Sequence, residues 1–578
     1  MIRFRFSYLA PAIPLLLFAV YLSTSTPAVG LIDSGEIAAG CYLLNILHPT
    51  GYPLYTLLGR LFSLLPLGKV VNRLTLLSAL FSALAAAVFI FICRRRQYNL
   101  WTSAAIALLI GLSPPVWSVS TDAEVYSLTL FLSALVWLVV FCSKATNAVL
   151  IFAFLSGLTL TNHLTGLWTV IGAGLSLLLI YRRHLARVSR LFLPFFLFGL
   201  TPYLFLILRS QANPLLAWGN PVNLTRLWWH ITGRQYQVWM FSSSLRGVLS
   251  NAGRGLVMLA RTFGLVLVPL VIYGWMVLFR KEKELTIGLT VSVLLCLVYA
   301  ANYSIPDIDA YYLPAVIGLA VFCASGINQL HRRLGKFAYS VWLVPLAIFF
   351  LNYPAQDKSQ DWVGYDQALN TLKSAEANAI IITDWWDIYA PVFYLQEIEK
   401  VRPDVCIIDK ELLRRSWYFN YLEKKYPWLV QNSRLEINRF MVHLQRFEYN
   451  RPYDPLEIQK SYIGLLRSLF TNNPGRPAYV TFPADAGEDA RQMLAGWNLV
   501  PVGILFQVRA DTIVPGFDYA RLCVRIPRFG LTERTRFNLD RYQIFIFSRI
   551  ALLNKLHRFT EAQAVEEWYQ TRFKGYRL

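Results

Sequence analysis

Two carboxylates and a histidine early in the chain have a spacing that could support acid–base chemistry. Asp33 and Glu36 are three residues apart, so both side chains can lie on one face of a helix. His48 follows within the rigid stretch His-Pro-Thr-Gly-Tyr-Pro at residues 48–53. An aspartate in such a cluster can take a proton from a hydroxyl group. The alternative is a capping box, in which Asp33 and Glu36 only begin a helix, but the nearby histidine and turn favour a functional role.

Two later motifs place further polar residues at the ends of apolar runs. Asp122 and Glu124 precede Tyr126 in the stretch Ser-Thr-Asp-Ala-Glu-Val-Tyr. Asn162 and His163 lie between two apolar runs in the stretch Thr-Asn-His-Leu-Thr. A structural interpretation stays open here too. The threonine before Asp122 has capping-box spacing to Glu124, and a single histidine at a helix junction is usually a satisfied polar group.

Arginines and tyrosines in two further loops complete the candidate set. The planar guanidinium group of Arg209 or Arg234 could bind a phosphate in bidentate fashion. Both could instead reach lipid headgroups, and this alternative is stronger for Arg209. A last motif, Asp-Ala-Tyr-Tyr-Leu-Pro, begins at Asp309. The residues that we expect to bind substrate are His48, Tyr52, Asp122, Glu124, Tyr126, Asn162, His163, Arg209, Arg234, Tyr236, Asp309, Tyr311 and Tyr312.

The rest of the sequence must position these residues, and its composition indicates a membrane protein. Of 578 residues, 56% are hydrophobic, and the mean hydropathy is +0.42. The apolar residues form runs of about 20, the length that a helix needs to cross the hydrocarbon core. The formal net charge is +21, but many of the basic residues lie in short clusters between apolar runs, so we expect no nucleic-acid partner. Seven cysteines without a CxxC pair indicate neither a zinc site nor a disulfide framework.

The basic clusters predict the number of membrane spans and their orientation. If these clusters lie in the cytoplasm, an odd number of spans puts the C-terminus outside. We therefore predict a multi-pass plasma (inner) membrane protein with a cytoplasmic N-terminus. The motifs then collect on the outer face, where costly ionisable groups at membrane depth favour function. The predicted spans, eleven in all, lie at about 8–29, 71–93, 100–117, 125–143, 147–162, 164–181, 191–208, 255–279, 285–303, 311–328 and 338–353.

The composition changes in the last third of the chain. Four β-rich runs, at 379–383, 405–408, 478–482 and 500–508, alternate with helical stretches, and the residues from about 541 are typical of a helix. The predicted fold is an α-helical polytopic membrane domain over residues 1–353, followed by an extracytoplasmic α/β domain over residues 354–578. Within the membrane domain, 31–67 and 210–254 are expected outer loops whose helices lie at the membrane interface.

Taken in order, the motifs resemble those of a known family. The matching stretches are DSGE, HPTGYPLYTLLG, VWSVSTDAEVYSL, GLTLTNHLT, the segment from WGNP to RQY, and DAYYLP, with weaker similarity through NAIIITDWWDIYAPVFYLQ and RPDV. They resemble a family of polytopic proteins long catalogued as a domain of unknown function. That family is now grouped with the protein O-mannosyltransferases of the GT-C glycosyltransferase superfamily. The resemblance covers most of the membrane portion.

The resemblance implies a GT-C membrane fold, a lipid-phosphate-linked sugar donor, and an aspartate in the first outer loop as the catalytic base. That role falls on Asp33, with Glu36 as the adjacent acid. Thr50 stands where many relatives have proline, a change that we expect the site to tolerate. The resemblance does not determine which sugar is transferred.

We therefore expect an inverting glycosyltransferase that moves a sugar from a polyprenyl-phosphate-linked donor to a hydroxyl group of a protein or glycan acceptor at the outer membrane face. A phosphate leaving group needs cationic stabilisation, for which Arg209, Arg234, His48 and His163 are candidates, with or without a divalent cation. No cofactor is certain from the sequence. The alternative is a membrane transporter or a lipid-sugar flippase, but the sequence shows neither inverted repeats nor charged residues near the bilayer midplane.

Overall fold

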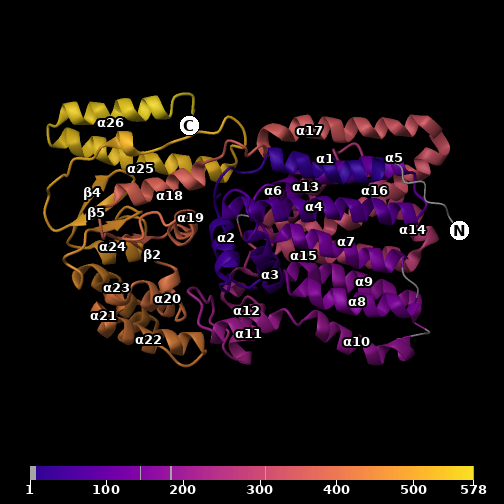
Figure 1. Cartoon of the computed structure of the whole chain (residues 1–578), viewed down its shortest axis with the longest axis horizontal. Coiled ribbons are helices and arrows are strands. Elements are labelled where there is room, and N and C mark those ends of the chain that lie inside the picture. The colour runs from indigo at the N-terminus through magenta and orange to yellow at the C-terminus, as the bar shows by residue number, and fades with distance from the viewer. Residues whose placement is uncertain (1–7, 143–144, 183–184, 306–307, 577–578) are drawn as a thin grey trace.

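The computed structural model describes residues 8–142, 145–182, 185–305 and 308–576. The molecule is elongated and has two parts, a bundle of long, roughly parallel helices and a C-terminal part at its other end (Figure 1). We call these the membrane part and the C-terminal part. The short helices α2 and α3 lie between them (Figure 1).

The membrane part contains the long helices, and short helices connect them. The long helices and their bent continuations are α1 (Leu9–Ser23), α4 (Val70–Arg95), α5 (Leu100–Gly111), α6 (Pro114–Ser120), α7 (Tyr126–Cys142), α8 (Ala145–Leu160), α9 (Leu167–Tyr181), α10 (Leu185–Gly199), α11 (Tyr203–Gln211), α13 (Leu245–Thr262), α14 (Val268–Lys281), α15 (Lys283–Ala301), α16 (Leu313–Leu334) and α17 (Leu343–Gln356). The shorter elements are α2 (Ser34–Leu43), α3 (Pro53–Ser63), α12 (Leu224–Ile231) and the 3₁₀ helices η1 (Leu164–Gly166), η2 (Arg234–Trp239), η3 (Ile308–Tyr312) and η4 (Gly335–Trp342).

Length and hydropathy identify several of these helices as membrane spans. In the described part of the chain, four helical stretches are long and apolar enough to cross a bilayer, namely Val70–Arg95, Leu164–Tyr181, Lys283–Ala301 and Ile308–Gln356. Two bent pairs also qualify when each pair is taken as one span, Leu100–Gly111 with Pro114–Ser120 at 67° and Arg190–Gly199 with Tyr203–Gln211 at 45°. The expected membrane character is thus confirmed, whereas the count of eleven spans and their orientation stay predictions.

Some predicted spans are not continuous helices. The predicted span 100–117 is broken, because Pro114 cannot donate the backbone hydrogen bond that would continue α5. The predicted span 255–279 contains a turn at Gly264, whose φ is +64°, between α13 and α14. The first span was expected to reach residue 29, but α1 ends at Ser23. An apolar run has the same composition whether or not its helix is broken, so hydropathy alone misses these turns.

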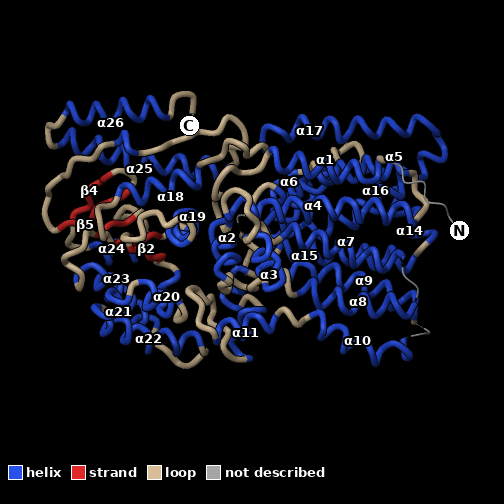
Figure 2. The backbone as a smooth tube through the Cα atoms, viewed as in Figure 1, coloured by secondary structure: helices blue, strands red, loops and turns tan. Residues whose placement is uncertain are grey.

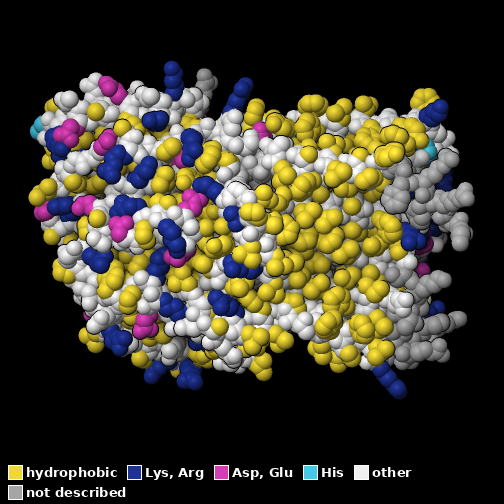
Figure 3. Space-filling view, in the orientation of Figure 1, with side chains coloured by type: hydrophobic (Ala, Val, Ile, Leu, Met, Phe, Trp, Pro, Cys, Tyr) yellow, Lys and Arg dark blue, Asp and Glu magenta, His cyan; other side chains and the backbone are white. Residues whose placement is uncertain are grey.

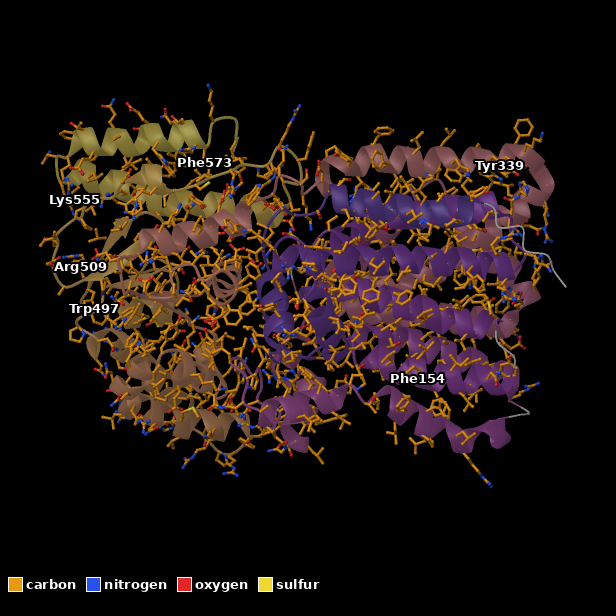
Figure 4. The ribbon with its side chains drawn as sticks, in the orientation of Figure 1. Phe154, Tyr339, Trp497, Arg509, Lys555 and Phe573 are labelled. Carbon is orange, nitrogen blue, oxygen red and sulfur yellow. The ribbon has the colours of Figure 1, made fainter. Side chains whose placement is uncertain are left out.

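The two parts differ in the surface that they present. Hydrophobic side chains cover the visible face of the membrane part, whereas charged side chains are scattered over the C-terminal part (Figure 3). Phe154 lies in the membrane part, whereas Arg509 and Lys555 lie at the far end of the C-terminal part (Figure 4). Phe350 on α17 is 66% exposed. A continuous apolar surface of this extent is unusual on a soluble monomer and fits contact with lipid.

The C-terminal part is built around a sheet enclosed by helices (Figure 2). Its described residues form a five-stranded sheet in the order β2-β1-β3-β5-β4. Strand β1 pairs in parallel with β2 and β3, with Ile380 opposite Cys406 and Ala478, while β5 pairs antiparallel with β3 and β4. Every residue of β1 is buried, as expected for a short apolar strand inside a parallel arrangement.

The strands and helices of the C-terminal part follow one another in an α/β pattern. The predicted single run at 500–508 is wrong in one respect, because it is a hairpin of two strands that turns at Gly503, where φ is +59°. The elements are α18 (Val363–Ser374), β1 (Ile380–Thr383), α19 (Trp386–Glu397), β2 (Cys406–Asp409), η5 (Leu412–Arg414), α20 (Tyr418–Lys425), α21 (Pro427–Asn432), α22 (Arg434–Glu448), α23 (Pro455–Thr471), β3 (Ala478–Val480), α24 (Glu488–Leu494), β4 (Asn498–Val502), β5 (Leu505–Arg509), η6 (Tyr519–Arg521), α25 (Glu533–Lys555) and α26 (Phe559–Arg572).

Candidate active site

Three residues near α2 form an acid–histidine cluster. Asp33 directly precedes α2, Glu36 lies in the first turn of α2, and His48 lies in the turn before α3. The Glu36 carboxylate accepts two hydrogen bonds from His48, one from the backbone N–H at 2.8 Å and one from Nδ1 at 2.6 Å. Nε2 of the same ring lies 3.7 Å from Oδ2 of Asp33. The structure thus brings together Asp33, Glu36 and His48, the first candidate group in the sequence analysis.

The capping-box interpretation of both motifs is wrong. Among the described residues, Asp33 makes no side-chain hydrogen bond that caps α2, and Glu36 directs both of its carboxylate oxygens to His48. In the second motif, the Thr121 hydroxyl donates to carbonyl oxygens of the preceding helix α6, while α7 begins only at Tyr126. The carboxylates of the first motif therefore serve the contacts around His48 and do not cap α2.

Burial and neighbouring charges set the protonation of the cluster. Burial raises the pKa of Asp33 above its ordinary value, and the charge of His48 opposes that rise. For His48, burial by itself lowers the pKa, but the charges of Glu36 and Asp33 together raise it to about 9. At neutral pH, His48 is therefore a cation held between two acids.

His163 lies in a different environment, a box of aromatic rings. The Tyr52 ring stacks on the imidazole with 5.5 Å between centroids and an interplanar angle of 6°, and the Tyr126 and Tyr311 rings lie at 4.8 and 5.4 Å. Nδ1 accepts a hydrogen bond from the backbone N–H of Thr165 at 3.1 Å. Burial lowers the pKa of His163 to about 3. The imidazole is therefore neutral at pH 7, which favours His48 over His163 as the cation of the site.

Tyr52 connects the two histidines. Its hydroxyl group lies 2.8 Å from Nε2 of His48 and donates to the carbonyl oxygen of Pro49 at 3.1 Å, while its ring stacks on His163. The backbone of the turn requires a glycine beside it. Gly51 has a φ of +88°, and a Cβ atom there would lie 2.8 Å from Nε2 of His230 on α12.

The C-terminal part supplies two contacts to the site that the sequence analysis did not identify. Nε1 of Trp386 donates a hydrogen bond to Oδ1 of Asp33 at 2.7 Å. Oδ1 of Asp387 accepts one from the backbone N–H of Ile32 at 2.9 Å. Both residues begin α19, directly after strand β1. The carboxyl ends of parallel strands are common ligand sites, so their position after the run at 379–383 was the available signal.

The start of α19 is itself firmly anchored. Asp387 is fully buried, and its carboxylate accepts hydrogen bonds from Arg534, at 2.8 to 3.0 Å, and from Nδ2 of Asn538 at 2.8 Å. Helix α2 packs closely against α19, because a Cβ atom at Gly35 would lie 2.3 Å from the carbonyl oxygen of Ala390. The glycine between Asp33 and Glu36 therefore permits the two parts of the molecule to meet at the site.

Asp122, Glu124 and Asn162 lie close to the cluster. Oδ1 of Asp122 accepts a hydrogen bond from the Ser34 hydroxyl at 2.7 Å and so holds the first turn of α2. The charge of Glu124 contributes to the raised pKa of His48. Asn162 is fully buried and donates to the carbonyl oxygen of Val125 at 3.0 Å, which joins the end of α8 to the region before α7. These contacts position the site.

Three predicted site residues do not join the cluster. Arg209 donates to the carbonyl oxygens of Leu43 and Leu44, at 3.2 and 2.6 Å, and so caps the C-terminus of α2. The Tyr312 side chain is buried against α13, where a Cβ atom at Gly255 would lie 2.3 Å from its hydroxyl oxygen. Asp309 is exposed on η3. Arg209 and Tyr312 therefore have structural contacts away from the cluster, and their expected role in substrate binding stays a prediction.

Arg234 and Tyr236 lie on η2, beside the site. The Arg234 guanidinium group lies 4.0 Å from the centroid of the Trp229 ring, and its Nη2 donates to Oδ1 of Asn450 at 3.0 Å. Burial raises the pKa of Tyr236 well above its ordinary value, and the charges of Glu36 and Asp33 add to that rise. Arg234 thus links η2 to the C-terminal part. Tyr236 lies close enough to Glu36 and Asp33 for their charges to affect its pKa.

The cluster also has the composition of a metal site. Within the described residues, Asp33, Glu36 and His48 form the one group of three such side chains that could hold an ion, with ligand atoms within 4.8 Å of one another. Two carboxylates and an imidazole suit a divalent cation. However, both His48 ring nitrogens already contact protein groups, Glu36 and the Tyr52 hydroxyl.

Comparisons with known proteins match one segment of the membrane part and one segment of the C-terminal part. Residues 33–187 match the family described as protein O-mannosyl-transferase TMEM260 N-terminal domain, and residues 364–433 match TMEM260-associated domain 2. The first match begins at Asp33, and the second contains Trp386 and Asp387. The resemblance to O-mannosyltransferases is thereby confirmed.

Full-length relatives and a solved structure extend this similarity. The chain is 27% identical over 433 residues to protein O-mannosyl-transferase TMEM260 of Mus musculus, covering 68% of this chain and 61% of the relative. It is 24% identical over 465 residues to protein O-mannosyl-transferase tmem260 of Dictyostelium discoideum, covering 69% of this chain and 56% of that relative. The match thus spans less than two thirds of each relative. The fold is similar to that of ArnT from Cupriavidus metallidurans in the apo state, with a TM-score of 0.52, 13% identity, and coverage of 86% of this chain and 97% of that chain.

Proposed function

We propose that this relative of the O-mannosyltransferases is an inverting glycosyltransferase. It moves a sugar from a polyprenyl-phosphate-linked donor to a hydroxyl group of a protein or glycan acceptor at the outer membrane face. The observation that carries the proposal is Asp33, whose side chain is 24% exposed at the boundary between the membrane part and the C-terminal part. There it can meet a lipid-borne donor from one side and an aqueous acceptor from the other.

In the proposed reaction, Asp33 acts as the general base. Its carboxylate takes the proton of the acceptor hydroxyl group as that oxygen attacks the anomeric carbon. The bond from this carbon to the phosphate oxygen breaks, and the electron pair leaves on the polyprenyl phosphate. A single displacement of this kind inverts the configuration at the sugar. Trp386 donates to Oδ1 of Asp33, and Oδ2 lies 3.7 Å from Nε2 of the His48 cation. We assign the acceptor proton to Oδ2.

The leaving phosphate group needs positive charge more than it needs a proton. His48 supplies a cation at neutral pH, because its pKa is raised to about 9. The other candidate, Arg234 on η2, contacts the Trp229 ring and Asn450 instead. Preorganised charges in a site sheltered from water stabilise developing negative charge strongly. We assign this role to His48.

A divalent cation is the cofactor that this donor set would hold. Asp33, Glu36 and His48 would be its ligands, and when bound it would supply Lewis-acid stabilisation to the phosphate. Binding requires His48 to lose its proton and to exchange a hydrogen bond to Glu36 or Tyr52 for the ion. Activity in the presence and absence of a chelator separates the metal-assisted reaction from one that relies on the His48 cation alone.

The alternative of a transporter or flippase fits the geometry less well. A transporter places its charged groups near the bilayer midplane, between repeats of its fold. Here the acid–histidine cluster lies at α2, between the membrane part and the C-terminal part (Figure 1), and Trp386 of the C-terminal part contacts Asp33 directly. This location fits chemistry at a membrane surface.

The test uses the purified full chain in lipid nanodiscs with polyprenyl-phosphate mannose as donor. Wild type should release polyprenyl phosphate, and Asp33→Asn should release it about 100- to 10,000-fold more slowly, the usual contribution of a general base. Asp511→Asn is the matched control, because Asp511 is an exposed aspartate paired with Arg509 at the far end of the molecule. Full activity of Asp33→Asn would overturn the catalytic assignment, and retention of configuration in the product would overturn the inverting mechanism.

A further inference from the structure

A cavity of about 770 Å³ lies beside the acid–histidine cluster. One wall comes from the loop residues Pro49 and Gly219 and from α12 and η2, and the other comes from residues 414–417, α22 and α23. None of the lining residues belongs to the long apolar helices of the membrane part. The cavity is therefore a feature of the aqueous side of the site.

A row of tryptophans connects the cavity to the catalytic cluster. Trp417 lines the cavity, and its ring centroid lies 4.8 Å from that of Trp218. The Trp218 ring in turn lies 5.9 Å from His48 and 5.6 Å from Trp386, the residue that binds Asp33. Pro49, which follows His48 in the chain, also lines the cavity. A molecule bound in the cavity would reach the edge of the catalytic cluster.

The cavity wall carries more positive than negative charge. Its lining contains four arginines, Arg226, Arg234, Arg414 and Arg415, and one acid, Glu448. That acid is already engaged, because its two oxygens accept hydrogen bonds from the backbone N–H and the hydroxyl group of Ser416. The wall as a whole therefore favours an anion.

The four arginines differ in how well they are paired. Arg414 forms ion pairs with Glu411 and Asp489. Within the described part of the chain, the contacts of Arg234 are to neutral groups, the Trp229 ring and Asn450. Arg415 is half-buried, and of the residues that the structure describes none forms a hydrogen bond or a close ion pair with its guanidinium group. Burial lowers the pKa of Arg415, and the charge of Glu448 only partly opposes that fall. A bound anion would compensate the charge of Arg415.

We propose that this cavity binds the acceptor and that Arg415, together with Arg234, recognises an anionic group on it, a carboxylate or a phosphate. The proposal rests on the proposed glycosyl transfer and names the chemical class of its acceptor. The planar fork of an arginine binds either group in bidentate fashion. The aromatic rings of Trp229, Trp417 and Tyr453 offer faces on which the rest of the acceptor can pack.

The donor phosphate is the other possible source of the anion, and the walls of the cavity argue against it. The polyprenyl chain of a donor stays in the bilayer, so its phosphate should approach Asp33 from between the apolar helices. The cavity is lined instead by α12, η2 and the C-terminal part. Its volume lies within the range of about 300–1,000 Å³ that is common for ligand sites.

The test compares two probes on the purified full chain in nanodiscs, inorganic phosphate and sugar-free polyprenyl phosphate. Wild type should bind inorganic phosphate saturably, and Arg415→Gln should weaken that binding at least tenfold while leaving the affinity for polyprenyl phosphate unchanged. Arg509→Gln is the matched control, because Arg509 is a distant arginine paired with Asp511. Arg415→Lys, which keeps the charge but loses the fork, should give an intermediate affinity.

Two results would overturn the proposal. If Arg415→Gln weakens the binding of polyprenyl phosphate as much as that of inorganic phosphate, the anion that Arg415 recognises belongs to the donor. If wild type and Arg415→Gln bind inorganic phosphate equally, the cavity has no anion site at Arg415. Should Arg415→Gln not fold, Arg234→Gln repeats the comparison at the second arginine. Donor turnover by wild type and Asp33→Asn tests glycosyl transfer separately, so each proposal can fail without the other.

Discussion

His48 and His163 both contact the Tyr52 side chain, yet their surroundings differ sharply. His48 is hydrogen-bonded to Glu36 and faces Asp33, and its pKa is raised to about 9. His163 is enclosed by tyrosine rings, and burial lowers its pKa to about 3. A histidine in water has a pKa of about 6.5. The site therefore raises the pKa of one histidine and lowers that of the other.

The comparison divides the site into an acidic half and an aromatic half. The acidic half contains Asp33, Glu36 and His48, and it can take up a proton and offset the charge of a phosphate. The aromatic half contains His163 and the rings around it, and it presents a neutral surface. A glycosyl transfer from a lipid needs both, because the reacting groups are charged while the rest of the donor is not.

The largest effect on this division is expected from Glu36→Gln. The substitution keeps the shape of the side chain but removes the charge that holds His48 as a cation. Loss of one partner from a buried ion pair costs about 3–5 kcal/mol, so we expect a clear loss of thermal stability and at least a 100-fold loss of donor turnover. Unfolding temperature and polyprenyl phosphate release are the measurements.

A suitable control for this variant is Glu561→Gln on α26. Glu561 also accepts two hydrogen bonds, both at 2.6 Å from Arg558, but it is exposed and lies in the C-terminal part. Exposed ion pairs contribute little, so this variant should behave like wild type. Equal effects of Glu36→Gln and Glu561→Gln would contradict the special role of the acidic half.

The next largest effect is a dependence of stability on pH that is caused by the titration of His48. Its folded-state pKa of about 9 lies above the ordinary value of about 6.5. The stabilisation is therefore fully present below pH 6.5 and is lost as the pH rises through 9. The difference corresponds to about 3 kcal/mol. Thermal unfolding between pH 6 and pH 10 should show this loss in wild type and a flatter profile in His48→Gln, and identical profiles would refute it.

The sequence was most informative where the site residues are neighbours along the chain. Asp33, Glu36 and His48 lie within sixteen residues of one another, so a helix and one turn bring them together. The capping-box alternative was wrong because a pattern of residue types does not show which partner a carboxylate will choose. Glu36 binds the His48 imidazole, a stronger partner than a backbone N–H at a helix start.

The sequence was least informative where the site depends on the packing of distant segments. Trp386 is separated from Asp33 by 353 positions, and only the close approach of α19 to Gly35 brings the two together. Tyr311 and Tyr312 are adjacent in the sequence, yet one contacts the His163 ring and the other is buried against α13. No pattern along the chain distinguishes such neighbours before the helices are packed.

A smaller effect is expected from Trp386→Phe, which removes the hydrogen bond from the C-terminal part to Asp33. A hydrogen bond to a charged group contributes about 1.5–3 kcal/mol, so donor turnover should fall roughly 10- to 100-fold. This bond lowers the pKa of Asp33, so its loss should move the acidic limb of the pH–rate profile to higher pH. Trp385→Phe is the control, because the Trp385 indole binds Asn538 and not Asp33. An unchanged acidic limb in Trp386→Phe would contradict the assignment.

The smallest effect should come from Tyr52→Phe, which tests whether the two halves act separately. The substitution removes the hydroxyl group that contacts His48 at 2.8 Å and keeps the ring that stacks on His163. One hydrogen bond contributes about 1 kcal/mol, so donor turnover should fall about fivefold while polyprenyl phosphate affinity stays the same. Weaker binding of polyprenyl phosphate by Tyr52→Phe would mean that the hydroxyl group serves the aromatic half as well, and the division of the site would then be wrong.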